Sequence, residues 1–269
     1  MDDSTRDRGS GKSERAGHRR RTARRLASWF GDTLWAEALY ARHPVSRWRV
    51  AQYSVGDRSP VLMLPGLFES WHVMEPIARR LHADGHPVYF TRAIGRNLGE
   101  IEPAAALAQA VLRGHRLRAV TIVAHSKGGL IGKRMMSVDD ADEGRVARMI
   151  TINTPFDGAP LARLAGRNTR NLRRGSPSLR ALAGQVAVNA RITTMVSAFD
   201  LHVPHFAGLP GAEHVDLDVV GHFRPLRDPG VVADIARRID RAEAASIPPP
   251  RSSSSVSYTH LTLPTIYSV

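Results

Sequence analysis

Ser126 stands where a serine could act as a nucleophile. It follows the β-branched apolar run at residues 120–123 and precedes a helical pattern, which places it in a tight strand–helix turn. Such a turn crowds the backbone, so small residues are needed two positions before and after the serine. Ala124 and Gly128 meet this need. The serine could attack a carbonyl carbon there, and the amide of Lys127 could stabilise the resulting oxyanion.

A serine hydroxyl is a weak nucleophile at neutral pH and needs a histidine base that a carboxylate orients. Asp200 and His222 are the candidates, because each closely follows an apolar run that predicts a strand, at residues 192–197 and 215–220. Sites in parallel sheets lie beyond the carboxyl ends of the strands. We therefore expect Ser126, Asp200 and His222 to meet at one edge of a sheet.

Other residues compete for two of these roles. His202 and His214 are alternatives to His222, although His214 precedes its strand and so lies at the wrong end of the sheet. His222 is favoured because the preceding Gly221 allows a tight turn. Asp157, which follows the strand before Asp200, is the second candidate for the acid.

An oxyanion hole needs two backbone N–H donors. Lys127 supplies one, and the loop after the strand at 61–64 is expected to supply the other from Leu67, with Phe68 as the alternative. His125, beside the nucleophile, is expected to shape the turn rather than to ionise.

The elements that position these residues alternate along the chain. Besides an edge strand at 49–55, we expect strands at 60–64, 87–91, 120–123, 148–153, 192–197 and 215–220, and helices at 71–84, 103–114, from 129 onward and at 230–245. Strands that alternate with helices predict an α/β fold, in which a mostly parallel central sheet is flanked by helices on both faces. We expect residues 48–246 to form this domain and to carry the catalytic residues.

Five segments of this domain resemble an α/β-hydrolase of the bacterial esterase/lipase type. They are residues 64–67, 123–129, 154–158, 199–204 and 220–223. The resemblance implies the α/β-hydrolase fold and hydrolysis of carboxylic esters through an acyl-enzyme, with no metal or cofactor. Ala124 stands where glycine is usual, and Pro65 where many members have histidine. Phe68, Phe156 and Phe223 are the expected substrate contacts.

The segment at about 159–190 is the expected cap, and we call it the insert. It is rich in arginine, and no Asp or Glu occurs between Gly158 and Phe199. Interleaved leucines make it amphipathic, which predicts contact with anionic lipid or an acidic substrate. A solvated helical face is the alternative.

The flanking segments are expected to lie outside the domain. Residues 1–25 predict a disordered basic arm, and residues 26–47 an amphipathic helix that packs on the domain or on a membrane surface. Its expected apolar side contains Leu26, Trp29, Phe30, Leu34, Ala38 and Leu39. Residues 247–269 predict a disordered tail, in which 255–269 resembles a translated sequencing adapter.

The composition of the chain excludes some kinds of chemistry and argues against some partners. The 269-residue chain has 42% hydrophobic residues, no cysteine and a net charge of +13, which excludes disulfides and thiol nucleophiles. Asp32 and Glu37 interrupt the first apolar stretch, so neither a signal peptide nor a transmembrane helix is predicted. Aromatic residues do not interleave with the basic runs, which argues against nucleic acid. We expect a cytoplasmic enzyme, peripheral to anionic membrane through arm and insert, that acts on small-molecule or lipid esters.

The sequence also fits two other interpretations. The same triad could carry out other acyl transfer, as a thioesterase, amidase or acyltransferase does. Alternatively, the chain could be a non-catalytic, hydrolase-like module that binds membranes.

Overall fold

A six-stranded sheet forms the centre of the computed structural model, which describes residues 27, 30–36, 38, 50–163, 167–204 and 208–246. Its strands are β1 (Val61–Leu64), β2 (Val88–Phe90), β3 (Val120–His125), β4 (Val146–Ile152), β5 (Ile192–Phe199) and β6 (Glu213–Val220). They lie in the order β2-β1-β3-β4-β5-β6, and every neighbouring pair is parallel. The predicted parallel sheet is therefore confirmed.

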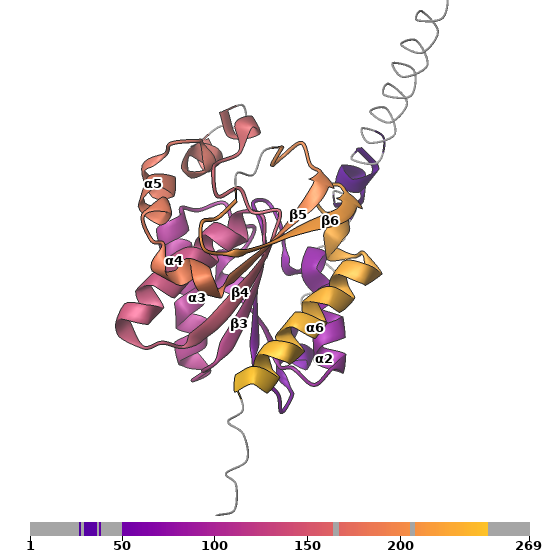
Figure 1. Ribbon diagram of the computed structural model, residues 1–269, viewed down its shortest axis with the longest axis vertical. Helices are drawn as coiled ribbons and strands as arrows, with labels where there is room; N and C mark the ends of the chain where they lie inside the picture. The colour runs from indigo at the N-terminus through magenta and orange to yellow at the C-terminus, as the bar shows by residue number, and fades with distance from the viewer. Residues whose placement is uncertain are drawn as a thin grey trace, which may run out of the picture.

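Helices cover both faces of this sheet. Helices α2 (Glu75–Ala83) and α6 (Pro229–Ser246) lie on one face, and α3 (Ile101–Gly114) and α4 (Lys127–Asp142) on the other (Figure 1). Strand β1 explains this arrangement, because its side chains alternate between two buried clusters. Val61 and Met63 pack with the residues of α2 and α6, whereas Leu62 and Leu64 pack with those of α3 and α4.

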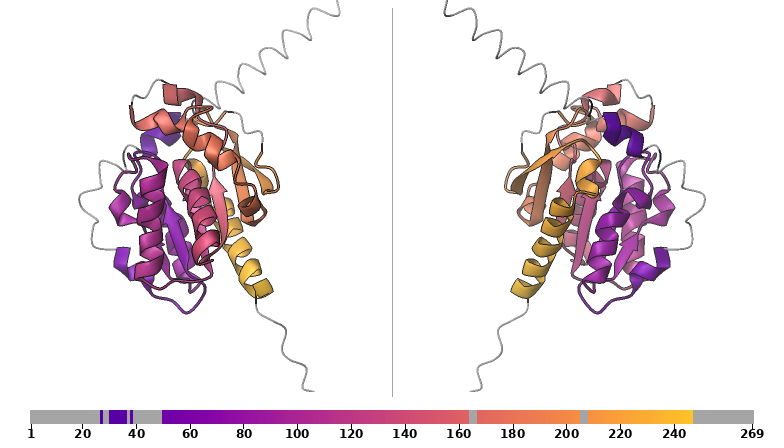
Figure 2. Two further views of the ribbon diagram at one scale, coloured as in Figure 1. Left: turned by 90° about the vertical axis from the view of Figure 1, so that its left-hand side faces the viewer. Right: turned by 90° about the vertical axis from the view of Figure 1, so that its right-hand side faces the viewer.

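The insert contains the short helical elements η5 (Pro160–Arg163), η6 (Arg167–Leu172), α5 (Pro177–Ala183) and η7 (Ala187–Arg191). Residues of η5 and η6 line the cavity that also contains Ser126, whereas η7 leads into the beginning of β5 and contacts the beginning of β4 through Arg191. Further 3-10 turns lie elsewhere, at η3 (Trp71–Met74), η4 (Arg92–Ile94) and η8 (Arg224–Leu226). Figure 2 shows that residues 30–36, here called the N-terminal helix, lie at the same end of the sheet as the insert.

The predicted edge strand at 49–55 is wrong, since these residues form the 3-10 helix η2 (Val50–Ser54). A 3-10 helix places residues three apart on the same side. Val50 and Tyr53 are spaced in this way, and both pack against the α2–α6 core. The Tyr53 ring also makes edge contacts with Trp71 and Phe90, which favours the helical turn over an exposed strand.

The N-terminal helix turns a different side to the domain than its apolar pattern predicts. Phe30 and Leu34 are 62% and 59% exposed, whereas Asp32 and Ala36 are buried. The cause is tertiary contact, because Asp32 forms hydrogen bonds with the domain. The expected basic arm at 1–25 and tail at 247–269, including 255–269, lie outside the described residues.

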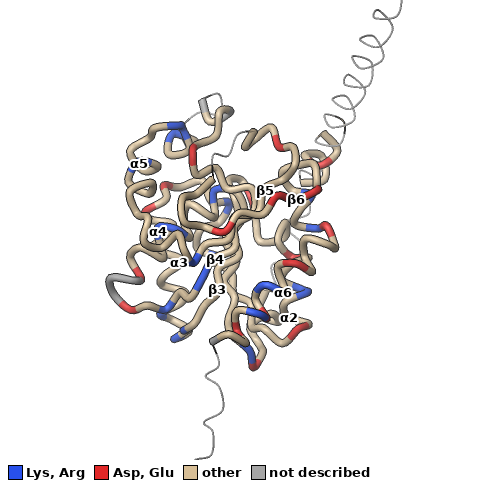
Figure 3. The backbone as a smooth tube through the Cα atoms, viewed as in Figure 1, with Lys and Arg blue, Asp and Glu red and all other residues tan. Residues whose placement is uncertain are grey.

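Charged positions are mixed over the surface of the described domain. Figure 3 shows basic positions on the insert, and basic and acidic positions side by side along α6. On α6 the two kinds form ion pairs, such as Arg238 with Asp234 at 2.7 Å. Of the helices in the described part of the chain, none combines the length and the apolar character that crossing a membrane requires.

Candidate active site

Ser126 occupies a strained turn between β3 and α4. Its backbone has φ 50° and ψ −123°, a conformation that costs free energy for any residue with a side chain and often marks functional sites. The close approach of β1 explains Gly128, because a Cβ at this position would lie 2.1 Å from the carbonyl oxygen of Leu64. The turn therefore has the geometry that the spacing of small residues predicts for a nucleophile.

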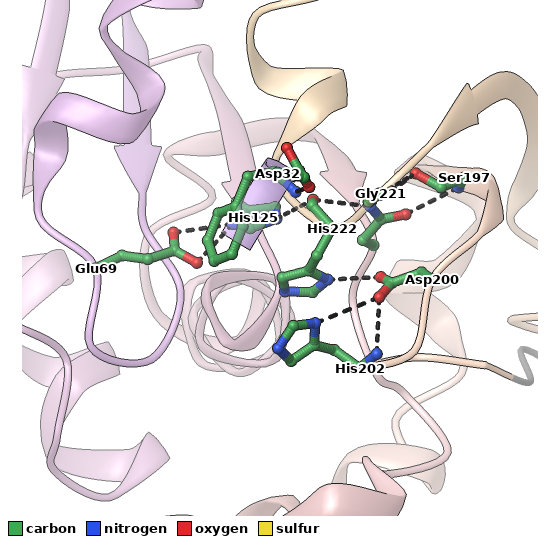
Figure 4. A network of polar contacts seen from close by, with 10 residues as sticks. Asp32, Glu69, His125, Ser197, Asp200, His202, Gly221 and His222 are labelled. Carbon is green, nitrogen blue, oxygen red and sulfur yellow. Dashed lines mark hydrogen bonds and ion pairs between the residues drawn. The ribbon is translucent and has the colours of Figure 1, made fainter. Parts of the chain in front are cut away.

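The structure brings His222 and Asp200 together beyond the ends of β6 and β5. The Nδ1 atom of His222 lies 2.5 Å from Oδ2 of Asp200, and both side chains are almost fully buried. The other carboxylate oxygen of Asp200 accepts a hydrogen bond from the backbone N–H of His202 at 2.8 Å. The ring of His202 lies beside that of His222, with 4.5 Å between centroids (Figure 4).

Burial and charge fix the protonation of this pair. Burial raises the pKa of Asp200, but His222 and His202 outweigh it and hold that pKa below its ordinary value. For His222, burial lowers the pKa and outweighs the opposite effect of Asp200. At neutral pH, Asp200 is thus a carboxylate and His222 a neutral imidazole. Because Nδ1–H then donates to Asp200, the lone pair of Nε2 can accept a proton.

Ser126 and His222 line one cavity of about 310 Å³. Its walls come from the loop after β1 at residues 65–70, here called the β1 loop, from the loops after β4, β5 and β6, from the insert and from the N-terminal helix. The lining residues besides Ser126 and His222 are Thr33, Leu67, Phe68, Glu69, Pro155, Ala159, Ala162, Thr169, Leu172, His202, Val203 and Phe223. Most of these side chains are apolar, as in pockets that bind small organic molecules.

A second buried acid–base pair, Glu69 and His125, lies beside the proposed nucleophile. Nδ1 of His125 is 2.7 Å from Oε1 of Glu69, and Nε2 is 3.0 Å from the carbonyl oxygen of His222. Oε2 of Glu69 also accepts a hydrogen bond from the N–H of Gly66 at 2.6 Å. The pair therefore joins the β1 loop, the Ser126 turn and the His222 turn.

The contacts of His125 favour an imidazolium. A carbonyl oxygen can only accept, so Nε2 must carry a proton, and the Glu69 carboxylate favours a second proton on Nδ1. Burial lowers the pKa of His125, but Glu69 outweighs it and raises that pKa above its ordinary value. The contacts agree with the expectation that His125 shapes the turn, and they favour its charged form in addition.

Lys127 has a buried side chain that points away from this chemistry. Its Nζ donates hydrogen bonds to the carbonyl oxygens of Asn97 and Gly99, at 2.8 and 2.5 Å. Burial lowers the pKa of Lys127 to about 8. The side chain thus holds the loop before α3, while the backbone amide of Lys127 is the group assigned to the oxyanion hole.

The predicted substrate contacts differ in their placement. Of the three phenylalanines, Phe68 and Phe223 line the cavity, and so does Leu67, whose N–H is the predicted second oxyanion donor. Phe156 is half-buried and packs against the core on the α3–α4 face, with its ring 5.9 Å from Nζ of Lys133; it is not among the cavity-lining residues.

The competing residues are also separated by the structure. His202 reaches the cavity and contacts Asp200. His214 lies near the beginning of β6, where its Nε2 is 3.1 Å from Asp216. The carboxylate that contacts the ring of His222 is Asp200; Asp157 remains in the turn that follows β4.

The sequence does not predict a role at the site for three residues at or beside the cavity. Thr33 and Asp32 belong to the N-terminal helix, and Glu69 lies in the β1 loop. Their contacts join positions far apart in the chain, such as Glu69 with His125. Glu69 lies only two positions after Leu67, the predicted oxyanion donor, and this proximity is a sequence signal for Glu69. Asp32 and Thr33 have no comparable signal.

Among the residues that the structure describes, two groups of side chains bring potential metal-ligand atoms within 4.8 Å of one another: Glu69, His125 and His222, and Asp200, His202 and His222. In each group the carboxylate is already hydrogen-bonded to one histidine ring, Glu69 to His125 and Asp200 to His222. His125 also uses both of its ring nitrogens. These contacts explain the clusters as acid–base pairs.

The fold is that of the α/β-hydrolases. The family model described as "PGAP1-like alpha/beta domain" matches residues 104–168, which include Ser126. A search of curated proteins found no match.

Solved structures with this fold include three with lipase or esterase names. A monoacylglycerol lipase of Paleococcus ferrophilus is 14% identical with a TM-score of 0.51, and the alignment covers 71% of this chain and 97% of that one. Lipase B of Aspergillus fumigatus is 16% identical with a TM-score of 0.58, and the alignment covers 73% of this chain and 59% of that one. A structure from a study of Nitrososphaera gargenis carboxylesterases is 15% identical with a TM-score of 0.52, and the alignment covers 71% of this chain and 94% of that one.

Proposed function

We propose that this protein is a serine hydrolase of carboxylic esters, with Ser126 as nucleophile, His222 as base and Asp200 as the carboxylate that orients it. One observation carries the proposal. Ser126 and His222 line the same cavity, while Asp200 holds Nδ1 of His222 at 2.5 Å. The strained backbone of Ser126 supports the same assignment.

The proposed reaction has two halves. Oγ of Ser126 attacks the ester carbonyl carbon as Nε2 of His222 takes its proton, and the amides of Leu67 and Lys127 stabilise the oxyanion. The tetrahedral intermediate collapses, the alcohol leaves with the proton from His222, and Ser126 remains acylated. A water molecule, deprotonated by His222, then attacks the acyl carbon. The bond to Oγ of Ser126 breaks, the acid leaves, and the proton on His222 returns to Oγ.

The cavity suggests the kind of ester. A volume of about 310 Å³ lies at the lower end of the range for small-molecule pockets. Leu172 and Ala162 of the insert and Phe223 beside the base give it apolar walls. We therefore propose an ester with a short or medium apolar acyl group, which contacts Phe68 and Phe223.

Hydrolysis of p-nitrophenyl esters from acetate to palmitate tests the proposal. We expect Ser126→Ala to lose at least about 10³-fold in kcat/KM, because the nucleophile is absent. Ser54→Ala is the matched control in η2 and should retain full activity. Equal rates for wild type and Ser126→Ala would refute the proposal. A preference for thioesters or amides over esters would favour the other acyl-transfer reactions.

We also propose peripheral contact with anionic membranes. The N-terminal helix exposes Phe30 and Leu34, and it follows an arginine-rich segment at 19–25. Apolar side chains beside basic ones are typical of interfacial helices. Sedimentation with vesicles of phosphatidylglycerol or phosphatidylcholine tests this. Binding of wild type to the anionic vesicles alone, weakened in Phe30→Ser/Leu34→Ser, is expected; equal binding of both proteins would contradict it.

A further inference from the structure

A buried carboxylate from the N-terminal helix contacts the turn that carries His222. Oδ2 of Asp32 accepts a hydrogen bond from the backbone N–H of Phe223 at 2.7 Å, and the Asp32 side chain is 1% exposed. The two residues are 191 positions apart in the chain. Figure 4 shows Asp32 next to the turn formed by Gly221 and His222.

Gly221 is shaped to receive this carboxylate. Its φ is +125°, and a Cβ at this position would lie 2.5 Å from Oδ2 of Asp32. The glycine is therefore needed both for its backbone conformation and for the space that Asp32 fills. A larger residue at this position would displace Asp32 from the turn.

The other peptide groups of the turn are held from within the domain. The N–H of Gly221 donates to the carbonyl of Phe199, and the carbonyl of His222 accepts from His125 and Asn153. The amide of Phe223 is the next group along the chain, and Asp32 holds it. Asp32 thus completes a set of hydrogen bonds that fixes the backbone on both sides of the His222 side chain.

Arg227 holds the same helix in place. Its Nη2 atom lies 3.5 Å from Oδ1 of Asp32, and its guanidinium lies 4.4 Å from the centre of the Trp35 ring. The adjacent Thr33 lines the cavity. The helix therefore supplies part of the cavity wall as well as a contact to the catalytic turn.

We propose that Asp32 is a positioning residue for His222, so that the N-terminal helix is part of the active site. The hydrogen bond to Phe223 fixes the direction in which the imidazole leaves the turn. Without it the ring would meet Ser126 less often in a productive geometry. This inference rests on the proposed function of Ser126 and His222.

Asp32→Ala and Asp32→Asn test the proposal in the full-length protein. A displacement of about 1 Å at a catalytic group can cost about 100-fold in rate, so we expect Asp32→Ala to lower kcat 10- to 100-fold with little change in KM. The asparagine retains an oxygen that can accept from Phe223 N–H, and it should restore most of kcat.

Asp139→Ala is the matched control for stability. Asp139 is also buried, and its Oδ2 accepts a hydrogen bond from the N–H of Val146 at 2.7 Å. It lies near the end of α4, beside the beginning of β4. Its loss should lower the melting temperature to a similar extent and leave kcat unchanged. Equal kcat values for Asp32→Ala and Asp139→Ala would overturn the proposal.

Two further measurements separate this proposal from the proposed function. The rate of Ser126 labelling by a fluorophosphonate should fall with kcat in Asp32→Ala. If wild type neither hydrolyses esters nor is labelled, the proposed function fails. In that case the low-field NMR signal of His222 Nδ1–H, assigned by its loss in His222→Gln, remains the readout. It should shift or vanish in Asp32→Ala but not in Asp139→Ala; an unchanged signal would refute the positioning role.

Discussion

Nδ1 of His125 lies 2.7 Å from the carboxylate of Glu69, and neither side chain is appreciably exposed. The pair stands between the β1 loop and the His222 turn, because Glu69 binds the N–H of Gly66 and His125 binds the carbonyl of His222. In the proposed mechanism, a lone carboxylate at this position would oppose formation of the oxyanion. A protonated His125 would balance the charge of Glu69, and the two residues would then depend on each other.

Glu69→Gln should therefore impair catalysis more than an exposed charge change does. Removing the carboxylate lowers the pKa of His125 and weakens the tie to the His222 turn. We expect kcat to fall about 10- to 100-fold and a new ionisation near neutral pH in the kcat/KM profile. Glu102→Gln, which breaks an exposed pair with Arg134, is the control. Profiles of the same shape for Glu69→Gln and wild type would contradict the imidazolium assignment.

The activity of wild type should fall on the acid side as His222 becomes protonated. Burial lowers the pKa of His222 and outweighs Asp200, so the midpoint should lie below the ordinary histidine value of about 6.5. Activity rises with pH through this midpoint, since the neutral imidazole is the base. The kcat/KM of a neutral ester between pH 4 and 8 measures it; a midpoint above 7 would be incompatible with the proposed environment.

Asp200→Asn should remove most of the activity without unfolding the protein. The amide can no longer hold the Nδ1–H tautomer of His222, and we expect a loss of about 10³- to 10⁴-fold in kcat. Asp216→Asn is the control, because Asp216 is exposed on β6. Full activity of Asp200→Asn would instead point to another acid.

Gly128→Ala and Gly114→Ala separate a required glycine from a tolerated one. An added Cβ at Gly128 would lie 2.1 Å from the Leu64 carbonyl oxygen, whereas nothing lies within 4 Å of one at Gly114. We expect Gly128→Ala to lose about 3 kcal/mol of unfolding free energy, and Gly114→Ala to stay within about 1 kcal/mol of wild type. Urea denaturation measures both; similar stabilities would mean that the turn can relax.

Lys133→Met should stabilise the protein at neutral pH. Burial lowers the pKa of Lys133 to about 8, below its unfolded value of about 10.5. Between these values the unfolded chain binds more protons, so this group makes stability rise with pH, and below pH 8 its full penalty applies. We expect a gain of about 1 to 3 kcal/mol at pH 7.

The same variant should lose part of the pH dependence. In wild type, the unfolding free energy should rise between pH 8 and 10 because unfolding takes up protons at Lys133 and at Lys127. In Lys133→Met, proton uptake on unfolding should fall by nearly one, so the slope should be smaller. The part of the slope that Lys127 contributes should remain. Arg79→Met, at a position 69% exposed, serves as the control. An unchanged slope in Lys133→Met would show that Lys133 is solvated in the folded state.

Prediction from sequence succeeded where local pattern decides structure. The apolar runs at 61–64 and 120–123 can only be satisfied by burial on both faces, which requires a sheet covered by helices. The strained turn at Ser126 is likewise recorded locally, in Ala124 and Gly128. Prediction failed at 49–55, because alternation and a spacing of three residues both fit Val50 and Tyr53, and packing against the core chose between them.

The chain by itself therefore determined the α/β-hydrolase sheet and the candidates Ser126, Asp200 and His222. Only the tertiary structure decided which polar groups meet around them. An amphipathic pattern does not state which side of a helix finds a partner, and here Asp32 faces the domain while Phe30 faces outward. Contacts such as Asp32 with Phe223, or Glu69 with His125, join distant residues. Their hydrogen bonds exist only once the folded chain excludes water from both partners.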